Sequence, residues 1–380
     1  MSIILYVGMD VHSTNYTLCT FSFQVNTETG ILDERIAYQV QIEPDYKLIL
    51  AYLQTIREHY PEDEVDFVCG YEAGCLGYSL YSNLTKAGVK CVILAPTTMA
   101  VSTDAKKRKN DKRDAERIAK CLAYGTYKAV YVPSEQDNQI KEYIRMRDDH
   151  KLQHKKVKQQ ILAFCMHNGY QFSGNNWTAA HMTWLKTVAM PAMLRETLDE
   201  YILTLVQLTD KIERFDNRIE ELASLPSYKE KVQKLSCFIG IKTHTAMGII
   251  VETGDFERFP SAEKYSAFLG LVPSESSSGE KQIMSGITKA GNSHIRRLLI
   301  EAAQRYGRGH IGYKSKALKA RQKDNPPSVI VYADKANERL RRKFYHMIRQ
   351  GKKNNVTKAA IARELACFIW GMMTDNTDVS

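Results

Sequence analysis

Short β-branched runs alternate with helix-favouring segments over about the first third of this 380-residue chain. The apolar runs expected to form strands span residues 3–9, 16–23, 36–42, 65–71 and 89–94. Helices are expected at residues 45–59 and 76–87, and an Ala/Lys/Arg-rich stretch over residues 111–122 predicts a third. Three strands in succession, followed by helices that alternate with strands, predict a mixed α/β sheet domain.

Four carboxylates occupy positions where such a fold brings side chains together. Asp10 and Glu72 each follow a predicted strand, and the functional crevice of an open α/β sheet lies beyond its strand ends. Asp111 and Asp114 are three residues apart, so one face of the predicted helix carries both. Four carboxylates suit two divalent ions about 4 Å apart, and Mg²⁺ is the natural occupant of an all-oxygen site. The alternatives are that Asp10 caps a turn, that Glu72 is a surface acid, and that the helix acids only complement the helix dipole.

The chain is basic, with a formal net charge of +10 and an isoelectric point near 9.0. Its 44% hydrophobic and 25% charged residues are ordinary for a soluble globular protein. The excess of positive charge therefore favours a nucleic-acid partner over a small molecule, and an acidic membrane surface is the weaker alternative. The side chains predicted to contact nucleic acid are Lys106, Lys107, Arg108, Lys109, Arg113, Lys289, Arg296 and Arg297. An ordinary solvated face is the competing interpretation of such charges.

The eight cysteines are scattered, form no Cys-x-x-Cys pair and have no histidine at the spacing of a zinc site. We interpret them as reduced cysteines of a cytoplasmic protein. The apolar run at residues 3–9 lacks the features of a signal peptide, and no later run approaches the roughly 20 apolar residues of a membrane span. A cytoplasmic location without membrane association is therefore expected.

Beyond Pro133 the composition becomes charged and helix-favouring, with one helix expected near residues 137–164. A second helical stretch places apolar residues alternately four and three positions apart, which is a heptad pattern. Its members are Leu194, Leu198, Tyr201, Leu205, Leu208, Ile212, Phe215, Ile219 and Leu222. This heptad seam predicts a coiled coil and with it an oligomer, whereas the alternative is a long amphipathic helix packed on its own domain. The connector between the two helices, residues 169–191, has no readable function.

Two turns in the C-terminal part carry further chemical signals. Ile239-Gly240-Ile241 precedes a helix-favouring stretch and resembles one half of a helix-hairpin-helix, which offers backbone amides to a phosphate. An ordinary helix corner is the alternative there. Further along, Ser276-Ser277-Ser278-Gly279 follows Leu271-Val272-Pro273. By chemistry alone, such a serine-rich turn is usually a flexible loop.

The order of these motifs resembles the DEDD transposases of the insertion-sequence one-hundred-ten family and their Piv-type DNA invertase relatives. Gly8-Met9-Asp10-Val11 is similar to the first acidic motif of that family, Tyr71-Glu72-Ala73-Gly74 is similar to its second, and residues 109–115 follow in the expected order. The C-terminal resemblance includes a nucleophilic serine five residues after the Leu-x-Pro proline, which is Ser278 here. The domains that this resemblance implies are a RuvC-like, RNase-H-type catalytic domain at residues 1–133, a helical coiled-coil region at 134–232 and a mostly α-helical transposase domain at 233–380.

The resemblance also implies how such a chain acts. Asp10, Glu72, Asp111 and Asp114 would hold Mg²⁺, and Ser278 would attack a phosphodiester to give a covalent phosphoserine intermediate. The serine of one protomer would complete the acidic site of another within a dimer or tetramer. Donor and target DNA would be specified by base pairing to a structured non-coding guide RNA, in a prokaryotic, nucleoid-associated setting. Two rival functions stay open: a hydrolytic RuvC-like nuclease or junction resolvase, and a non-enzymatic nucleic-acid-binding scaffold built on the coiled coil.

Overall fold

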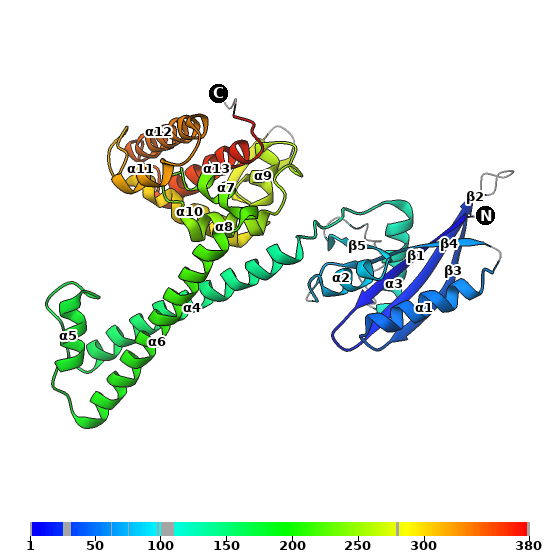
Figure 1. The fold of residues 1–380 in the computed structure, drawn as a ribbon, viewed down its shortest axis with the longest axis horizontal. Coiled ribbons are helices and arrows are strands. Elements are labelled where there is room, and N and C mark those ends of the chain that lie inside the picture. Colours follow the sequence, from blue (N-terminus) through cyan, green and yellow to red (C-terminus); the bar gives the residue numbers. More distant parts are fainter. Residues whose placement is uncertain are drawn as a thin grey trace. The chain divides into compact units, whose positions relative to one another are not determined.

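Two compact units make up the chain, Met1–Val132 and Pro133–Ser380 (Figure 1). The computed structural model describes residues 2–25, 32–61, 63–74, 76–96, 99, 110–278 and 281–377. The units divide beside Pro133, where the sequence changes from alternating strands and helices to a succession of helices.

The described strands of the first unit form a mixed sheet in the order β3-β2-β1-β4-β5. They are β1 Ser2–Val11, β2 Tyr16–Val25, β3 Leu32–Ile42, β4 Glu64–Glu72 and β5 Lys90–Leu94. The first three run antiparallel as a meander, whereas β4 pairs in parallel with both β1 and β5. The strands expected from the sequence and the mixed α/β class of this domain are thereby confirmed.

Helices cover both faces of this sheet. They are α1 Tyr46–Glu58, α2 Ser79–Lys86 and α3 Asp111–Tyr124. Ile49 of α1 and Leu84 of α2 pack with Val7 on one face, whereas Leu122 of α3 packs with Tyr6 on the other. Val7 and Tyr6 are neighbours on β1 and point in opposite directions, because successive side chains of a strand alternate between the two faces.

The helix α3 lies directly on the backbone of β1, because a glycine faces it. A β-carbon at Gly8 would lie 2.1 Å from the carbonyl oxygen of Ala115 and 2.3 Å from the amide nitrogen of Ala119. Any larger residue would therefore push the helix away from the strand. Asp10, two residues further along β1, lies on the same face of the sheet, so this contact brings the start of α3 towards it.

Two long helices of the second unit pack against each other in opposite directions (Figure 1). They are α4 Glu135–His167 and α6 Ala192–Ala223. Arg147 of α4 pairs with Asp216 of α6, whereas His154, further along α4, lies 3.3 Å from Thr209, which comes earlier in α6. The contacts thus run in reverse order along the two helices. We call this antiparallel pair the α4–α6 hairpin.

The predicted heptad seam is buried inside the α4–α6 hairpin. Leu198, Leu205 and Leu208 of α6 pack with Val157 and Ile161 of α4. The periodicity therefore identified the buried face of the helix, but its partner belongs to the same chain. The seam therefore fits the alternative prediction, a long amphipathic helix packed on its own domain. Because residues of the same chain cover the seam, it does not form an oligomeric coiled coil. Oligomerisation stays a prediction and requires another surface.

The connector at residues 169–191 folds against the same hairpin. It forms the helix α5, Ala179–Thr187, whose Leu185 is fully buried. His181 is also buried, stacks on Trp184 and accepts a hydrogen bond at Nδ1 from the backbone amide of Trp177, at 3.1 Å. These aromatic contacts give both tryptophans a structural role.

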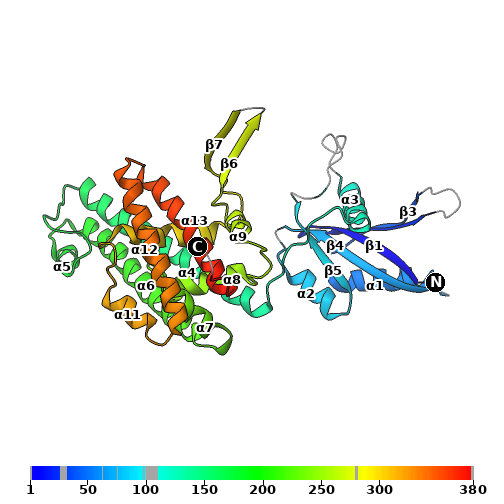
Figure 2. The ribbon, with the colours of Figure 1, turned by 90° about the horizontal axis from the view of Figure 1, so that it is seen from above.

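The remaining described part of the second unit is mostly helical. Its helices are α7 Pro226–Leu235, α8 Thr243–Thr253, α9 Ala262–Phe268, α10 Ser293–Ala303, the 3₁₀ helix η3 Gln304–Gly307, α11 Lys316–Gln322, α12 Pro327–Arg349 and α13 Asn354–Met373. The strands β6 Pro273–Ser278 and β7 Lys281–Ile287 pair antiparallel and project from these helices (Figure 2). Ile144 of α4 and Ile219 of α6 share a core with Leu365 of α13, so the α4–α6 hairpin and the C-terminal helices belong to one unit. No described helix combines the length and the apolar composition of a membrane span.

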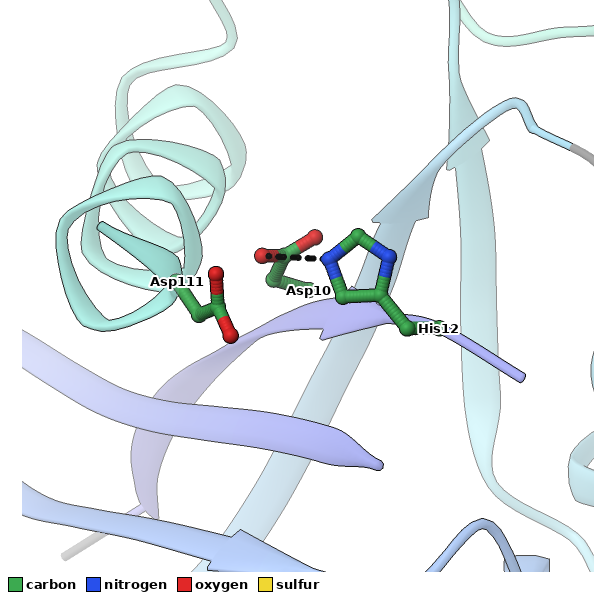
Figure 3. A group of neighbouring side chains, drawn as sticks. All are labelled: Asp10, His12 and Asp111. Atoms are coloured by element: carbon green, nitrogen blue, oxygen red, sulfur yellow. Dashed lines mark hydrogen bonds and ion pairs between the residues drawn. The ribbon is translucent and has the colours of Figure 1, made fainter. Parts of the chain in front are cut away.

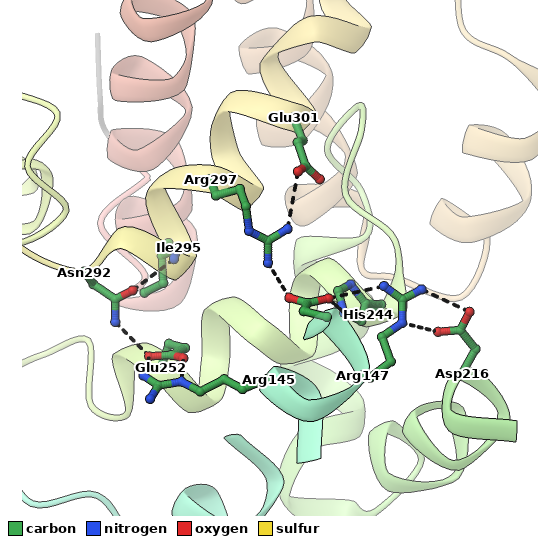
Figure 4. A network of polar contacts seen from close by, with 10 residues as sticks. Arg145, Arg147, Asp216, His244, Glu252, Asn292, Ile295, Arg297 and Glu301 are labelled. Atoms are coloured by element: carbon green, nitrogen blue, oxygen red, sulfur yellow. Dashed lines mark hydrogen bonds and ion pairs between the residues drawn. The ribbon is translucent and has the colours of Figure 1, made fainter. Parts of the chain in front are cut away.

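A buried carboxylate ties α4 to α8 and α10 (Figure 4). Asp148 of α4, whose side chain is 11% exposed, pairs with Arg147 and with Arg297 of α10, and His244 Nε2 of α8 lies 3.1 Å from its Oδ1. Burial by itself raises the pKa of the Asp148 carboxyl, but the contacts with His244, Arg297 and Arg147 outweigh it and lower the pKa to about 2. The network therefore fixes the position of α4 on the C-terminal helices.

We expect Asp148→Asn to lower the free energy of unfolding of the second unit by about 2–4 kcal/mol at pH 7, because the amide leaves Arg147 and Arg297 without their shared buried charge. The pKa in the folded protein lies below the ordinary value of 3.8, so this contribution is complete above about pH 4 and is lost as the pH falls towards 2. Urea unfolding of both proteins at pH 7 and pH 3 measures it, and the difference should narrow at pH 3.

The matched control for this prediction is Asp149→Asn, at the exposed neighbouring position, which should change stability by less than about 0.5 kcal/mol. An equal loss in the control variant, or a difference that stays constant down to pH 3, would contradict the assignment to Asp148.

Candidate active site

The ends of β1 and β4 place two of the predicted acids beside each other. The strands pair in parallel with Met9 opposite Tyr71, and both of these side chains point into the core beneath α1 and α2. The residues that follow them, Asp10 and Glu72, therefore point to the opposite face, which α3 covers.

The first turn of α3 supplies the other two acids. Asn110 caps the helix, and its side-chain oxygen accepts a hydrogen bond from the backbone amide of Lys112 at 3.1 Å. Asp111 and Asp114 lie in this turn, where a carboxylate interacts favourably with the helix dipole. The contact of Gly8 with Ala115 and Ala119, in the turns that follow, holds the start of α3 near the end of β1.

Asp10, His12 and Asp111 form a compact group at the end of β1 (Figure 3). One donor atom from each residue lies within 4.8 Å of the others, and His12 Nε2 lies 3.3 Å from Asp10 Oδ2. All three side chains are partly exposed, so solvent ions can reach them. Carboxylate oxygens suit Mg²⁺ and Mn²⁺, and an imidazole nitrogen adds a ligand that transition metals accept. The donor set therefore fits a divalent metal ion.

Arg117 of α3 links the remaining two acids. Its Nη2 lies 3.2 Å from Glu72 Oε2 and 3.5 Å from Asp114 Oδ1. One cation is thus shared by a carboxylate from a strand end and a carboxylate from the helix. The four acids of the sequence prediction lie in two pairs at one edge of the sheet, Asp10 with Asp111 and Glu72 with Asp114.

The electrostatics of Asp10 reflect this crowding. Burial raises the pKa of its carboxyl, His12 opposes that shift, and the negative charges of Asp111 and Asp114 raise the pKa further. A carboxylate whose charge is disfavoured by its neighbours gains most from a bound cation. The arrangement therefore has the chemistry of a cation-binding site.

His12 was missed by the sequence analysis. The only signal available in the sequence was its place two residues after Asp10, just beyond the predicted strand. In the structure the amide of His12 donates to the carbonyl of Asn15 at 2.9 Å, within the turn between β1 and β2. This turn returns the ring of His12 towards Asp10 (Figure 3).

Ser278 ends the strand β6, where its backbone pairs with Lys281 of β7. The serine-rich segment that the sequence presents as a turn is therefore a strand of a hairpin. The side chain of Ser278 lies outside the described residues, and its role as a nucleophile stays a prediction.

The predicted nucleic-acid contacts have different surroundings. Those that lie outside the described residues are Lys106, Lys107, Arg108 and Lys109. Arg113 and Lys289 are exposed. Arg296 donates to the carbonyl of Leu269 at 2.9 Å, and Arg297 pairs with Glu301 as well as with the buried carboxylate of α4, so structural contacts engage both guanidinium groups. Contact of these residues with nucleic acid stays a prediction.

Family comparison covers both units of the chain. A DEDD transposase model of the IS110 family matches residues 7–166, and a model described as "Transposase IS116/IS110/IS902 family" matches residues 232–316. The first match contains all four acids, and the second contains Ser278.

Known proteins are similar to the chain over most of its length. The protein y4qE of Sinorhizobium fredii, which is named as a transposase, is 30% identical over 368 residues, or 97% of this chain and 88% of the relative. The transposase for insertion sequence element IS1533 of Leptospira borgpetersenii is 29% identical over 355 residues, or 92% of this chain and 98% of the relative. These matches confirm the resemblance that the motifs carry. The chain belongs to the IS116/IS110/IS902 family and is a DNA transposase.

Proposed function

We propose that this transposase cleaves and rejoins DNA at the acidic site of its first unit, with Ser278 as the nucleophile. The observation that carries the proposal is the gathering of Asp10, Glu72, Asp111 and Asp114 at one sheet edge, from two strand ends and one helix turn. The order β3-β2-β1-β4-β5, with acids at the ends of the parallel neighbours β1 and β4, supports a RuvC-like, RNase-H-type fold for this domain.

The four carboxylates would hold Mg²⁺, with His12 as a nitrogen donor beside Asp10 and Asp111. A bound divalent ion supplies positive charge to the phosphoryl oxygens and lowers the pKa of a coordinated hydroxyl. The chain itself brings the carboxylates together, through the contact of Gly8 with α3 and through the ion pairs of Arg117.

Ser278 would attack the phosphorus of a phosphodiester. The serine hydroxyl gives up its proton as the Oγ–P bond forms, the P–O bond to the leaving deoxyribose breaks, and the leaving oxygen takes up a proton. A serine hydroxyl is a weak nucleophile at its free pKa, so it has to be activated by the site that it enters. Because the phosphoserine intermediate retains an ester bond to the DNA, the strand can be rejoined without ATP.

The partners in this proposal are nucleic acids and further copies of the chain. The net charge of +10 supports binding of donor and target DNA. Base pairing to a structured non-coding RNA would select these DNA sites, and assembly into a homo-oligomer would bring the serine of one protomer to the acidic site of another. Family membership is the ground for both parts.

Covalent attachment to DNA tests the chemistry. Wild-type protein incubated with donor DNA and Mg²⁺ should give a protein–DNA adduct that withstands SDS and disappears on proteolysis. Ser278→Ala should give no adduct and should cleave more slowly by a factor on the order of 10⁴ or more. Cleavage by Ser278→Ala at a near wild-type rate would assign the reaction to water and to a hydrolytic nuclease. Unchanged function in Asp111→Asn would instead favour a scaffold.

A further inference from the structure

A cavity of about 610 Å³ lies in the second unit, between the turn that precedes α8 and the segment that follows α10. Its volume falls within the range of about 300–1,000 Å³ that small-molecule sites occupy. The turn reaches this position because Gly240 has a φ of +85°, and a β-carbon there would lie 2.6 Å from the carbonyl oxygen of Ala302 in α10. The four acids and Ser278 do not line the cavity.

Cations dominate the lining of this cavity. The Lys and Arg side chains that line it are Lys242, Arg305, Arg308, Arg321 and Arg341. Across the described residues, the side chains of Lys242, Arg305 and Arg308 are exposed and make no hydrogen bond or ion pair. The carboxylate in the lining, that of Glu301, is paired with Arg297 at 3.3 Å. Uncompensated positive charges around a concave surface attract an anion.

The start of α8 opens onto the same cavity. This helix of 11 residues begins after Lys242, and no side chain among the described residues caps it. His244 and Thr245 of its first turn line the cavity. The first amides of a helix have no partner within the helix, and such uncapped amides bind phosphate.

Arg341 stabilises the wall formed by residues 308–313. It is 5% exposed and donates hydrogen bonds to the carbonyls of Arg308, His310 and Tyr313. Its Nε is buried and has no partner among the described residues. The wall is therefore held in place from inside, and a buried donor beside the cavity stays unsatisfied.

The apolar part of the lining contains an exposed aromatic ring. Leu298 and Leu318 line the cavity together with Tyr313, which is 48% exposed. The Tyr313 ring lies 5.0 Å from the ring of His310, on the segment that Arg341 holds. Nucleic-acid bases stack on exposed aromatic rings of this kind.

We propose that this cavity binds one nucleotide of a single-stranded nucleic acid. The phosphate lies against Lys242, Arg305 and Arg308 and the start of α8, and the base lies against Tyr313. Positive charge combined with a stacking ring is the usual design of single-strand binding sites. A duplex keeps its bases paired and stacked, so it reaches the cations without entering the cavity. The inference rests on the proposed function only in requiring a nucleic-acid substrate, and it uses neither the acidic site nor Ser278.

Fluorescence anisotropy with full-length protein and labelled 20-nucleotide probes tests the proposal. The probes are single-stranded DNA, single-stranded RNA of the same sequence, and the DNA duplex. Arg305→Gln/Arg308→Gln should weaken single-strand binding about 10-fold or more and reduce the slope of log K against log salt by about 1.4, because two phosphate contacts are lost. Tyr313→Ala should weaken single-strand binding by about 5- to 100-fold, and Tyr313→Phe should restore it.

The matched control is Lys229→Gln/Lys231→Gln, which removes two exposed charges from α7, outside the cavity lining. It should leave the salt slope within about 0.5 of wild type. Weaker binding of the cavity variants to the single-stranded DNA or to the single-stranded RNA supports the proposal. The probe with the larger loss of affinity identifies the kind of strand that the cavity binds. Unchanged single-strand binding in both cavity variants overturns the proposal. The proposal is also overturned if Arg305→Gln/Arg308→Gln weakens duplex binding as much as single-strand binding while Tyr313→Ala leaves single-strand binding unchanged. Asp111→Asn should bind all probes normally while failing to cleave, so the two proposals fail separately.

Discussion

A mixture of Ser278→Ala chains and Asp111→Asn chains will regain DNA cleavage that neither variant supports alone. Each variant lacks one half of the proposed site, so each should lose on the order of 10⁴-fold or more in rate by itself. If the serine of one protomer serves the acids of another, a mixed assembly contains one complete site. Cleavage of labelled donor DNA as a function of the mixing ratio measures the recovery, which should be greatest near equal amounts.

Two controls define this experiment. Ser276→Ala changes a serine on the same strand, β6, and should cleave at close to the wild-type rate. A chain that carries both Ser278→Ala and Asp111→Asn should restore nothing when it is added to either single variant. Full activity of either single variant would show that the residue changed is not required for cleavage. If the protein is a confirmed oligomer and mixing restores no cleavage, the serine and the acids of one chain act in the same site.

Asp10→Asn will abolish divalent-metal binding by the first unit. Asp10 shares its donor group with Asp111 and His12, and the amide removes the charge that attracts the ion. Changes to outer-shell partners of metal ligands cost about 10- to 100-fold in affinity, so loss of a direct ligand should exceed that range. Isothermal titration of the full-length protein with MnCl₂ and with MgCl₂ measures the affinity without reference to activity.

The same titration assigns the role of His12. We expect His12→Ala to weaken Mn²⁺ binding by about 10- to 100-fold and Mg²⁺ binding by less, because imidazole is a ligand that transition metals accept more readily than Mg²⁺ does. Asp66→Asn is the matched control, since Asp66 is an exposed acid of β4 near the opposite end of that strand from Glu72. Equal affinity in Asp10→Asn and wild-type protein would show that the acids serve the helix dipole and the fold instead.

Much of the first unit could be predicted because its signals are local. A β-branched run that leads into Asp10 and an apolar run that leads into Glu72 indicate two strands and approximately where each strand ends. The helix of Asp111 and Asp114 follows from composition and spacing alone. The closeness of these acids also depends on the parallel pairing of β1 with β4, which the sequence pattern does not specify.

The features that escaped prediction depend on partners distant in the sequence. The heptad seam shows that one face of α6 is buried, but period alone does not say that Val157 and Ile161 of the same chain cover it. In the sequence Arg297 is predicted to contact phosphate, whereas in the structure it pairs with Asp148 of α4. His12 escaped because a single histidine in a polar turn resembles many others, and only the folded turn returns it to Asp10.

Arg117 is an ion-pair partner of two acids of the proposed metal site. Neighbouring carboxylates repel one another, and a cation between them relieves that repulsion. Arg117 already stands between Glu72 and Asp114, so the newly made chain carries its own counter-charge. If Glu72 and Asp114 hold a metal ion as proposed, an arriving ion would compete with this tethered guanidinium for both carboxylates. If the acids hold a metal ion as proposed, the first unit would become active only at an ion concentration high enough to displace the guanidinium from these two carboxylates.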